Sequence, residues 1–392
     1  MSRHAAAPAA LAVCVLLQAC IYSHREVESP PPQPFDFRLL PYPTYDADEG
    51  LQGHLLAAFR RPANRLPPPV SEMVSLDARI ATSGTRGALL AYDRSGRTIH
   101  WRLYTLLGAE RLRRAPYYGV GNDAFINDST QSLFPHYYRY QLLRTTAYVA
   151  YQHMLGSPHL RIHLAAQARH YAADPLEDST LFAADVRGGT LSDSGTASTA
   201  ELRLGLLWDT RDEEASPSRG VLLETMAARA LGDNDYTRYL VGARVFVPLD
   251  EFESWVLGLR QTTELASGTV PFYVAYERLT TWYLEDGFGG DRSLRLQPPG
   301  RYVAPNRVVV SADLRHKVLD VPYPASPFRL WMLGFGDIGR LWNAGETPQL
   351  RGLHWSAGLG GRAQFAKGTL FGVDIGASDA GFGFAISTMF AF

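Results

Sequence analysis

Residues 307–315 read RVVVSADLR, a stretch in which apolar and polar side chains largely alternate. Its apolar face carries Val308, Val310, Ala312 and Leu314, and its polar face carries Arg307, Ser311, Asp313 and Arg315. A period of two is typical of a β-strand with one apolar and one polar face. The period returns in residues 74–80, 99–103, 160–169 and 201–208, so the sequence predicts a protein built of such strands.

A soluble β-sandwich would show the same alternation, so the period alone does not separate it from a transmembrane β-barrel. Three features favour the barrel. The alternation runs for about 320 residues without a helical interruption, which corresponds to about 16 strands with their connections. Aromatic residues gather near predicted strand ends, and short turns such as 156–158 alternate with longer polar segments such as 172–198. We therefore predict an all-β fold, a transmembrane antiparallel barrel over residues 70–392 in the lipids of the bacterial outer membrane.

The C-terminal stretch continues the pattern. In FGFAISTMFAF, Phe382, Phe384 and Ile386 alternate with small residues, and we expect Phe390 and Phe392 to close the last strand. An aromatic residue at the end of an amphipathic strand is similar to the terminal signal by which outer-membrane barrels are recognised for assembly. That signal predicts the outer-membrane assembly machinery as a partner during biogenesis.

The N-terminal region differs from the rest of the chain. Residues 1–20 resemble an export signal, and the ending Leu17-Gln18-Ala19-Cys20 is similar to a bacterial lipobox, which predicts lipidation of Cys20. Ordinary cleavage after Ala19 is the alternative. Residues 21–69 are rich in proline, which favours extended conformations outside a sheet and predicts a periplasmic tether. Within it, residues 50–61 have the spacing of one short helix, and the alternative is that this segment enters the lumen as a plug.

Composition limits the function. The formal net charge is -1, which argues against nucleic acid as a partner. The two cysteines, Cys14 and Cys20, both lie in residues 1–20, so we expect no internal disulfide in the mature chain. The sequence has no G-x-S-x-G elbow, and its histidines lack a metal-ligand spacing. We therefore predict no enzyme activity, no cofactor and no metal site.

Upstream of the alternating strand, residues 289–302 read GGDRSLRLQPPGRY. Glycine and proline break both helices and strands, so this stretch predicts a long loop, and long loops are often functional. An arginine offers a permanently charged, planar fork of donors to carboxylates. We expect the loop to fold back into the barrel lumen, where Arg295 pairs with Asp313 and with Asp337 of the segment FGDIG. The alternative is that Arg295 is a solvated loop arginine.

Three segments in this order resemble the BamA/TamA-like superfamily, the bacterial surface-antigen barrels that insert or translocate proteins. The first, WDTRDEEASPSRG, places Asp209, Arg211, Asp212, Pro217 and Gly220 at family positions. The second, GGDRSLRLQPPGRY, places Gly289, Gly290 and the family's lumen arginine, Arg295. The third, FGDIG, places Phe335, Asp337 and Gly339.

The resemblance implies a barrel that assists protein insertion into, or translocation across, the outer membrane. Its partner would be a client or periplasmic protein, and a homo-oligomer is also open. The competing interpretation is a non-catalytic pore or a structural or scaffold barrel. Two features depart from the family. Its insertases carry periplasmic domains, for which residues 21–69 leave no room. Leu296 and Gln297 follow the arginine where the family usually has glycine and an aromatic residue. Leucine disfavours the backbone angles open to glycine, so we expect a different loop conformation there.

Overall fold

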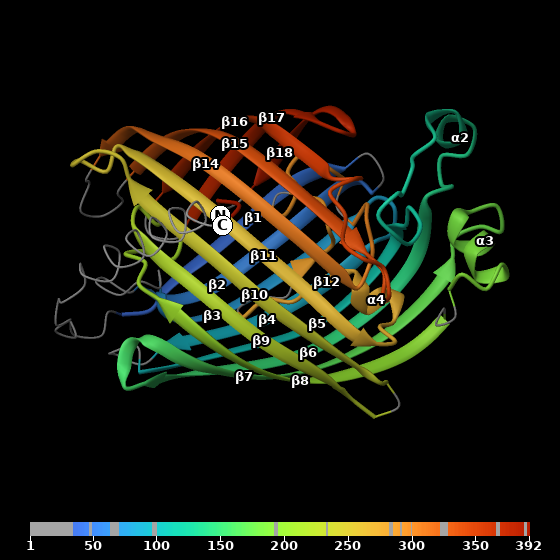
Figure 1. Cartoon of the computed structure of the whole chain (residues 1–392), viewed down its shortest axis with the longest axis horizontal. Helices are drawn as coiled ribbons and strands as arrows, with labels where there is room; N and C mark the ends of the chain where they lie inside the picture. Colours follow the sequence, from blue (N-terminus) through green and yellow to red (C-terminus); the bar gives the residue numbers. More distant parts are fainter. Residues whose placement is uncertain are drawn as a thin grey trace, which may run out of the picture.

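The chain folds as one antiparallel sheet of 16 strands that curls into a barrel (Figure 1). The computed structural model describes residues 34–46, 49–62, 70–95, 100–191, 195–232, 234–281, 285–290, 292–298, 300–321, 328–365, 369–387 and 390–392. The strands are β1 (Asp36–Asp46), β2 (Gly50–Pro62), β3 (Val70–Ala81), β4 (Arg86–Ser95), β5 (Trp101–Pro116), β6 (Arg139–Leu155), β7 (Ser157–Pro175), β8 (Gly195–Asp209), β9 (Gly220–Leu231), β10 (Tyr236–Pro248), β11 (Trp255–Gly268), β14 (Asn306–Val321), β15 (Phe328–Trp342), β16 (His354–Phe365), β17 (Thr369–Ser378) and β18 (Gly381–Ser387). Sheet order follows chain order, with β11 next to β14, and β1 and β18 are its two ends. The predicted barrel of about 16 antiparallel strands is confirmed.

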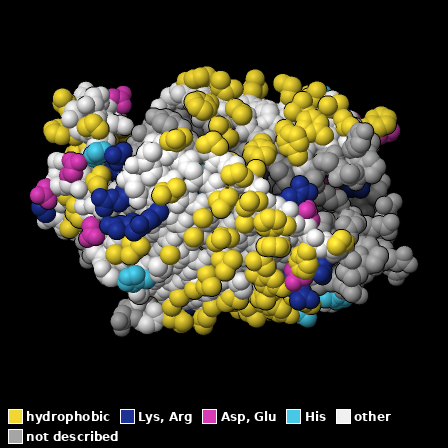
Figure 2. Space-filling view, turned by 180° about the vertical axis from the view of Figure 1, so that it is seen from behind, with side chains coloured by type: hydrophobic (Ala, Val, Ile, Leu, Met, Phe, Trp, Pro, Cys, Tyr) yellow, Lys and Arg dark blue, Asp and Glu magenta, His cyan; other side chains and the backbone are white. Residues whose placement is uncertain are grey.

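The two faces of the wall are arranged as a membrane requires. On β14, Val310 and Leu314 are 42% and 41% exposed, whereas Asp313 and Arg315 on the other face are 0% and 1% exposed. Apolar side chains therefore cover the outside, where Figure 2 shows them spread over the wall, and charged side chains line the interior. Among the described residues, no helix is long and apolar enough to cross a membrane.

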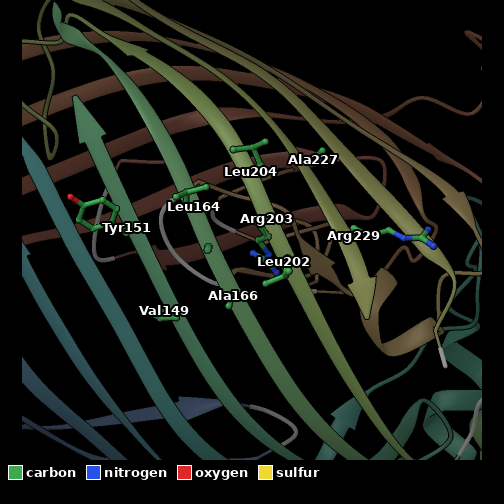
Figure 3. Close-up of a pocket in the computed structure, with 10 residues that line it drawn as sticks. Val149, Tyr151, Leu164, Ala166, Leu202, Arg203, Leu204, Ala227 and Arg229 are labelled. Carbon is green, nitrogen blue, oxygen red and sulfur yellow. The ribbon is translucent and has the colours of Figure 1, made fainter. Parts of the chain in front are cut away.

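The outer face also shows local relief. A shallow groove of about 620 Å³ crosses β6 to β9 (Figure 3). Its apolar lining includes Val149, Leu164, Leu202 and Leu204, and the small side chains of Ala166 and Ala227 leave the hollow. In this belt, hydrocarbon chains of the lipid are the surrounding medium.

The barrel has two unlike ends. At one end the connections are short, such as the turn at Gly156 between β6 and β7. At the other end lie the longer loops that carry α2 (Asp128–Leu133) and α3 (Leu181–Arg187), at the right of Figure 1. Bacterial outer-membrane barrels place short turns in the periplasm and long loops outside, so we call these the short-turn end and the long-loop end.

The N-terminal expectation needs correction. Within residues 21–69, β1 and β2 pair with each other over Asp36 to Asp46, and β2 pairs with β3. The expected helix over residues 50–61, the lumen plug and the tether are therefore wrong for this part, and the sheet begins at Asp36. The prolines predicted a tether, but Pro41 and Pro43 are tolerated in a strand at the end of the sheet. Residues 1–33 lie outside the described part of the chain, and so does the predicted lipidation site, Cys20.

The C-terminal expectation needs a second correction. β18 ends at Ser387, and Phe390 and Phe392 do not close it. Both side chains turn into the barrel interior, where they are 4% and 8% exposed and pack against Phe246 and Trp331. Alternation predicted the strand, but the phenylalanines find apolar partners inside the wall.

The arrangement of the wall predicts a position-dependent cost for charge. Leu202 is the central residue of β8 and faces outward, 52% exposed. Leu202→Arg should lower the free energy of unfolding by about 2–4 kcal/mol, because arginine is costly near the bilayer midplane. Thr196→Arg, at the long-loop end of the same strand, should cost about 0–1 kcal/mol. Urea unfolding in phospholipid vesicles measures both, and equal effects would contradict the outward assignment.

Candidate functional site

In the connection between β11 and β14, residues 269–305, the described segments turn inward and occupy the lumen. We call this connection the lumen loop. It contains α4 (Phe272–Ala275) and the short strands β12 (Glu277–Arg278) and β13 (Glu285–Asp286). Figure 1 shows α4 and β12 within the outline of the barrel. Leu279, Phe288 and Leu294 are at most 1% exposed, so the loop is packed as tightly as a protein core.

Arg295 is the centre of the loop's attachment to the wall. Its Nε and Nη2 donate to the two carboxylate oxygens of Asp337 at 2.8 and 2.7 Å, and its backbone N–H donates to Asp337 Oδ2 at 3.2 Å. Its Nη1 lies 2.8 Å from Asp313 Oδ1, an ion pair without hydrogen-bond geometry. All three side chains are 0% exposed. A buried charge is tolerated only when it is paired in this way.

Neighbouring residues prepare this ion pair. Asp313 on β14 and Asp337 on β15 face the interior from adjacent strands, where Asp313 is opposite Phe335. Arg315 Nη2 donates to Asp313 Oδ2 at 3.1 Å, and Ser356 Oγ donates to Asp337 Oδ2 at 3.0 Å. The Arg295 guanidinium lies 4.0 Å from the centroid of the Phe335 ring. The two carboxylates are therefore held in place by groups other than the arginine.

The glycines of the two segments make room. A Cβ on Gly339 would lie 2.7 Å from the Phe288 ring, so this position lets the loop approach the wall. Gly289 and Gly290 have φ of 108° and 91°, and a Cβ on Gly289 would lie 2.3 Å from the Pro298 carbonyl. Larger residues at these positions would push the loop off the wall.

Leu296 corrects the expectation about the loop backbone. It has φ of 66°, in the left-handed region that usually favours glycine. The backbone after Arg295 therefore bends as a glycine would allow, at a cost of about 1–2 kcal/mol for a leucine. The side chain packs against the interior cluster that contains Phe335, Phe390 and Phe392, and this contact offsets the strain.

A second anchor holds the loop on the opposite wall, and sequence reasoning missed it. The Glu277 carboxylate accepts hydrogen bonds from Arg169 Nη1 and the Tyr171 hydroxyl of β7, and from Gln167 Nε2 at 3.0 Å. Its backbone carbonyl accepts from Arg238 Nη2 at 2.8 Å. No spacing in the sequence marked Glu277, because the partners of its carboxylate lie 106 to 110 residues away.

Arg260 joins the loop to the C-terminal segment. On β11, its guanidinium donates to the carbonyls of Arg292 and Ser293 at 2.6 and 3.1 Å, and to the Ala391 carbonyl at 3.0 Å. Its charge lies 5.0 Å from the Phe392 ring centroid. Phe390 and Phe392, expected as a strand end, are thus neighbours of the lumen loop.

At the long-loop end, the loop contacts the last hairpin. Tyr302 stacks on His354 with ring centroids 3.7 Å apart, and His354 Nδ1 lies 2.6 Å from Asp379 in the turn between β17 and β18. His354 Nε2 lies 2.8 Å from the Asn122 carbonyl. Burial raises the pKa of the Tyr302 hydroxyl, and the coulombic effect of Arg301 opposes this rise. The loop is therefore fixed near the mouth as well as at its centre.

The first family segment lies elsewhere, between β8 and β9 at the short-turn end. Arg211 Nε and Nη2 donate to Asp209 at 3.0 and 2.9 Å, and Asp212 Oδ1 accepts from the Ser218 N–H at 3.0 Å. Pro217 is buried, and a Cβ on Gly220 would lie 2.4 Å from the Thr210 carbonyl. These residues shape their own turn and do not touch Arg295.

These features define a class of protein, a 16-stranded outer-membrane barrel whose lumen holds an inward loop. The model of the Omp85 superfamily domain matches residues 109–370, more than half of the chain, so the chain belongs to the Omp85 superfamily. The BamA/TamA-like resemblance and the outer-membrane location are thereby confirmed. No curated protein matches the chain by sequence.

Solved structures agree on the fold. BamA from Haemophilus ducreyi, lacking POTRA domains 1–3, is 14% identical with a TM-score of 0.56, covering 90% of this chain and 70% of that one. CdiB from Acinetobacter baumannii is 13% identical with a TM-score of 0.52, over 90% and 60%. CdiB from Escherichia coli is 10% identical with a TM-score of 0.54, over 90% and 66%. The chain thus spans less than two thirds of either CdiB chain, and at these identities the likeness concerns the fold alone.

The central ion pair predicts strong coupling. Arg295→Ala should lower the free energy of unfolding by about 3–5 kcal/mol, because it leaves the buried Asp337 without a cationic partner and Asp313 with Arg315 alone. In the double variant Arg295→Ala with Asp337→Ala, the loss of unfolding free energy should be smaller than the sum of the two single losses by about 1–3 kcal/mol. The exposed pair Arg229 and Asp235, 57% and 85% exposed, is the control, with a coupling below about 1 kcal/mol. Equal couplings in urea unfolding would contradict a buried lock.

The two anchors should be separable. Glu277→Gln removes the charge that pairs with Arg169, so backbone amides of residues 272–281 should exchange with deuterium faster. Residues 293–297 should keep their protection, because Asp337 still holds Arg295. Asp337→Asn should give the reverse pattern. Hydrogen exchange with mass spectrometry measures both segments, and simultaneous loosening in either variant would show that the loop moves as one unit.

Proposed function

We propose that this barrel assists the insertion of proteins into the outer membrane, or their translocation across it, at the seam between β1 and β18. Family membership supports this activity at the level of the superfamily. The observation that carries the proposal for this chain is the poor hydrogen-bonding capacity of the seam edge, in contrast to the firmly held lumen.

β1 is a poor partner for strand pairing on its free side. Pro41 and Pro43 lie within its continuous pairing with β2, and proline has no N–H. In a sheet, proline is tolerated where its nitrogen faces away from the ladder, so both nitrogens point toward the seam. Residues 39 and 40, on opposite faces of β1, are 55% and 42% exposed, so the strand is little covered on either side.

β18 is equally limited. It has 7 residues, whereas its neighbour β17 has 10. Its outward side chains Phe382, Phe384 and Ile386 are 78%, 74% and 69% exposed. A short apolar strand beside a proline-bearing strand favours a seam that opens to an amphipathic client strand and perturbs the surrounding lipid.

The lumen supports insertion over conduction. The loop that carries Arg295 is attached to β7, β14 and β15, so an open pore would require several buried ion pairs to break. The interior charges of the loop are engaged in fixing it, and we propose that they do not catalyse a reaction. A client protein with amphipathic strands is the proposed partner.

The seam can be tested directly. Vesicles that contain this protein should accelerate the folding of a small outer-membrane barrel added from solution. Pro41→Thr with Pro43→Thr restores two N–H donors and should slow that folding while raising stability. Pro248→Thr, at the end of β10 on the far wall, is the matched control and should leave the rate unchanged. Vesicles with no acceleration but large conductance would favour a pore.

A further inference from the structure

The loop between β8 and β9, residues 210–219, does more than connect two strands. It reaches across the short-turn end to three other strands. Glu214 pairs with Arg102 on β5, Glu213 pairs with Arg329 on β15, and Ser216 bonds to Gln364 on β16. β6 and β7 separate β5 from β8, and β10, β11 and β14 separate β9 from β15. These contacts therefore span the interior, and we call this loop the strap.

The base of the strap is fixed. Asp209 holds Arg211 with two hydrogen bonds, and Asp212 accepts the N–H groups of Ser218 and Arg219 at 3.0 and 3.3 Å. The Thr210 N–H donates to the Val221 carbonyl at 2.8 Å. Asp209, Arg211 and Asp212 therefore form a rigid turn, whereas Glu213 and Glu214 make the contacts with the distant strands β15 and β5.

Each of the two glutamates pairs with an arginine that also pairs with a second carboxylate. Arg102 is 3% exposed and donates to Glu214 at 2.8 Å and to Asp93 at 2.6 Å. Arg329 lies 3.3 Å from Glu213 and 3.6 Å from Asp320. When the strap leaves, neither arginine is stranded without a charge partner, and the glutamates, 15% and 22% exposed, reach water easily.

The strap differs from the ion pairs of Arg295 with Asp313 and Asp337, whose three side chains are 0% exposed. We call these ion pairs the Arg295 lock. Releasing that lock leaves buried charges unpaired, which is strongly unfavourable. Releasing the strap exchanges two pairs for water, Glu213 with Arg329 (22% and 34% exposed) and Glu214 with Arg102 (15% and 3% exposed). The more exposed Glu213 pair contributes little and weakens with salt, and Arg102 keeps Asp93 as a charge partner. The two closures therefore differ in how readily they open.

We propose that the strap is a releasable closure of the lumen at the short-turn end, latched by Glu213 and Glu214 and independent of the lumen loop. Its opening uncovers the interior from the periplasmic side while Arg295 stays in place. The inference rests on Glu213 and Glu214, and it does not require protein insertion at the seam between β1 and β18.

Labelling of a buried strap position tests the proposal. Ser216 is 2% exposed, so the thiol of Ser216→Cys should react slowly with a maleimide in the closed state. Adding Glu213→Gln and Glu214→Gln should raise the rate about tenfold, the ratio produced by about 1.4 kcal/mol. Peptide mapping separates this thiol from Cys14 and Cys20. Glu253→Gln is the control, because Glu253 pairs with Arg219 at the base of the strap from the neighbouring turn between β10 and β11 and does not bridge the mouth.

Two outcomes would overturn the proposal, namely an unchanged rate in the double glutamine variant or an equal rise in the control. If that variant does not fold, as judged by heat-modifiable electrophoresis, Ser216→Cys alone decides. Its labelling should accelerate between 0.1 and 1 M salt, where the screening length falls from about 10 to about 3 Å. A rate independent of salt would then contradict the latch. Arg295→Ala should leave the labelling rate unchanged, and acceleration there would refute independence from the lumen loop.

Discussion

The barrel depends on one buried arginine. Arg295 brings its charge to a place where two neighbouring strands have already positioned Asp313 and Asp337, and all three groups are shielded from water. An isolated arginine could not remain there, and neither could an Asp337 carboxylate without its arginine. The lumen loop is therefore part of the wall's own stability. Gly339, Phe335 and the left-handed turn at Leu296 all serve the close approach that this pairing requires.

The other contacts that hold the lumen loop, the strap and the seam differ in how deeply they are buried. Glu277 fixes the loop on β7, the Tyr302 and His354 contact fixes it at the long-loop end, and Phe390 and Phe392 pack beneath it. Partly exposed ion pairs hold the strap at the other end, and prolines limit the first strand at the seam. This arrangement supports the proposed activity at the seam over free conduction through the lumen.

Sequence patterns predicted the parts of this structure that local periodicity controls. Strict alternation gave the wall, and Gly and Pro around Arg295 gave the inward loop. Sequence patterns gave wrong predictions where tertiary contacts outweigh the local conformational preference of a residue. Pro41 and Pro43 indicated a tether, yet a strand at the end of the sheet accepts them. Phe390 and Phe392 continued the alternation, yet interior apolar partners draw them off the wall. Glu277 and the strap glutamates carried no signal, because their partners are distant in sequence.

The most direct measurement is a solid-state NMR distance between the Arg295 guanidinium nitrogens and the Asp337 carboxyl carbon, in the unmodified protein in lipid bilayers. A loop held by the wall predicts strong dipolar coupling from both Nε and Nη2, as in a bidentate pair with hydrogen bonds of 2.8 and 2.7 Å, together with a rigid arginine side chain. A mobile guanidinium without measurable coupling to Asp337 would contradict this prediction, because the loop would then occupy the lumen without being held by the wall.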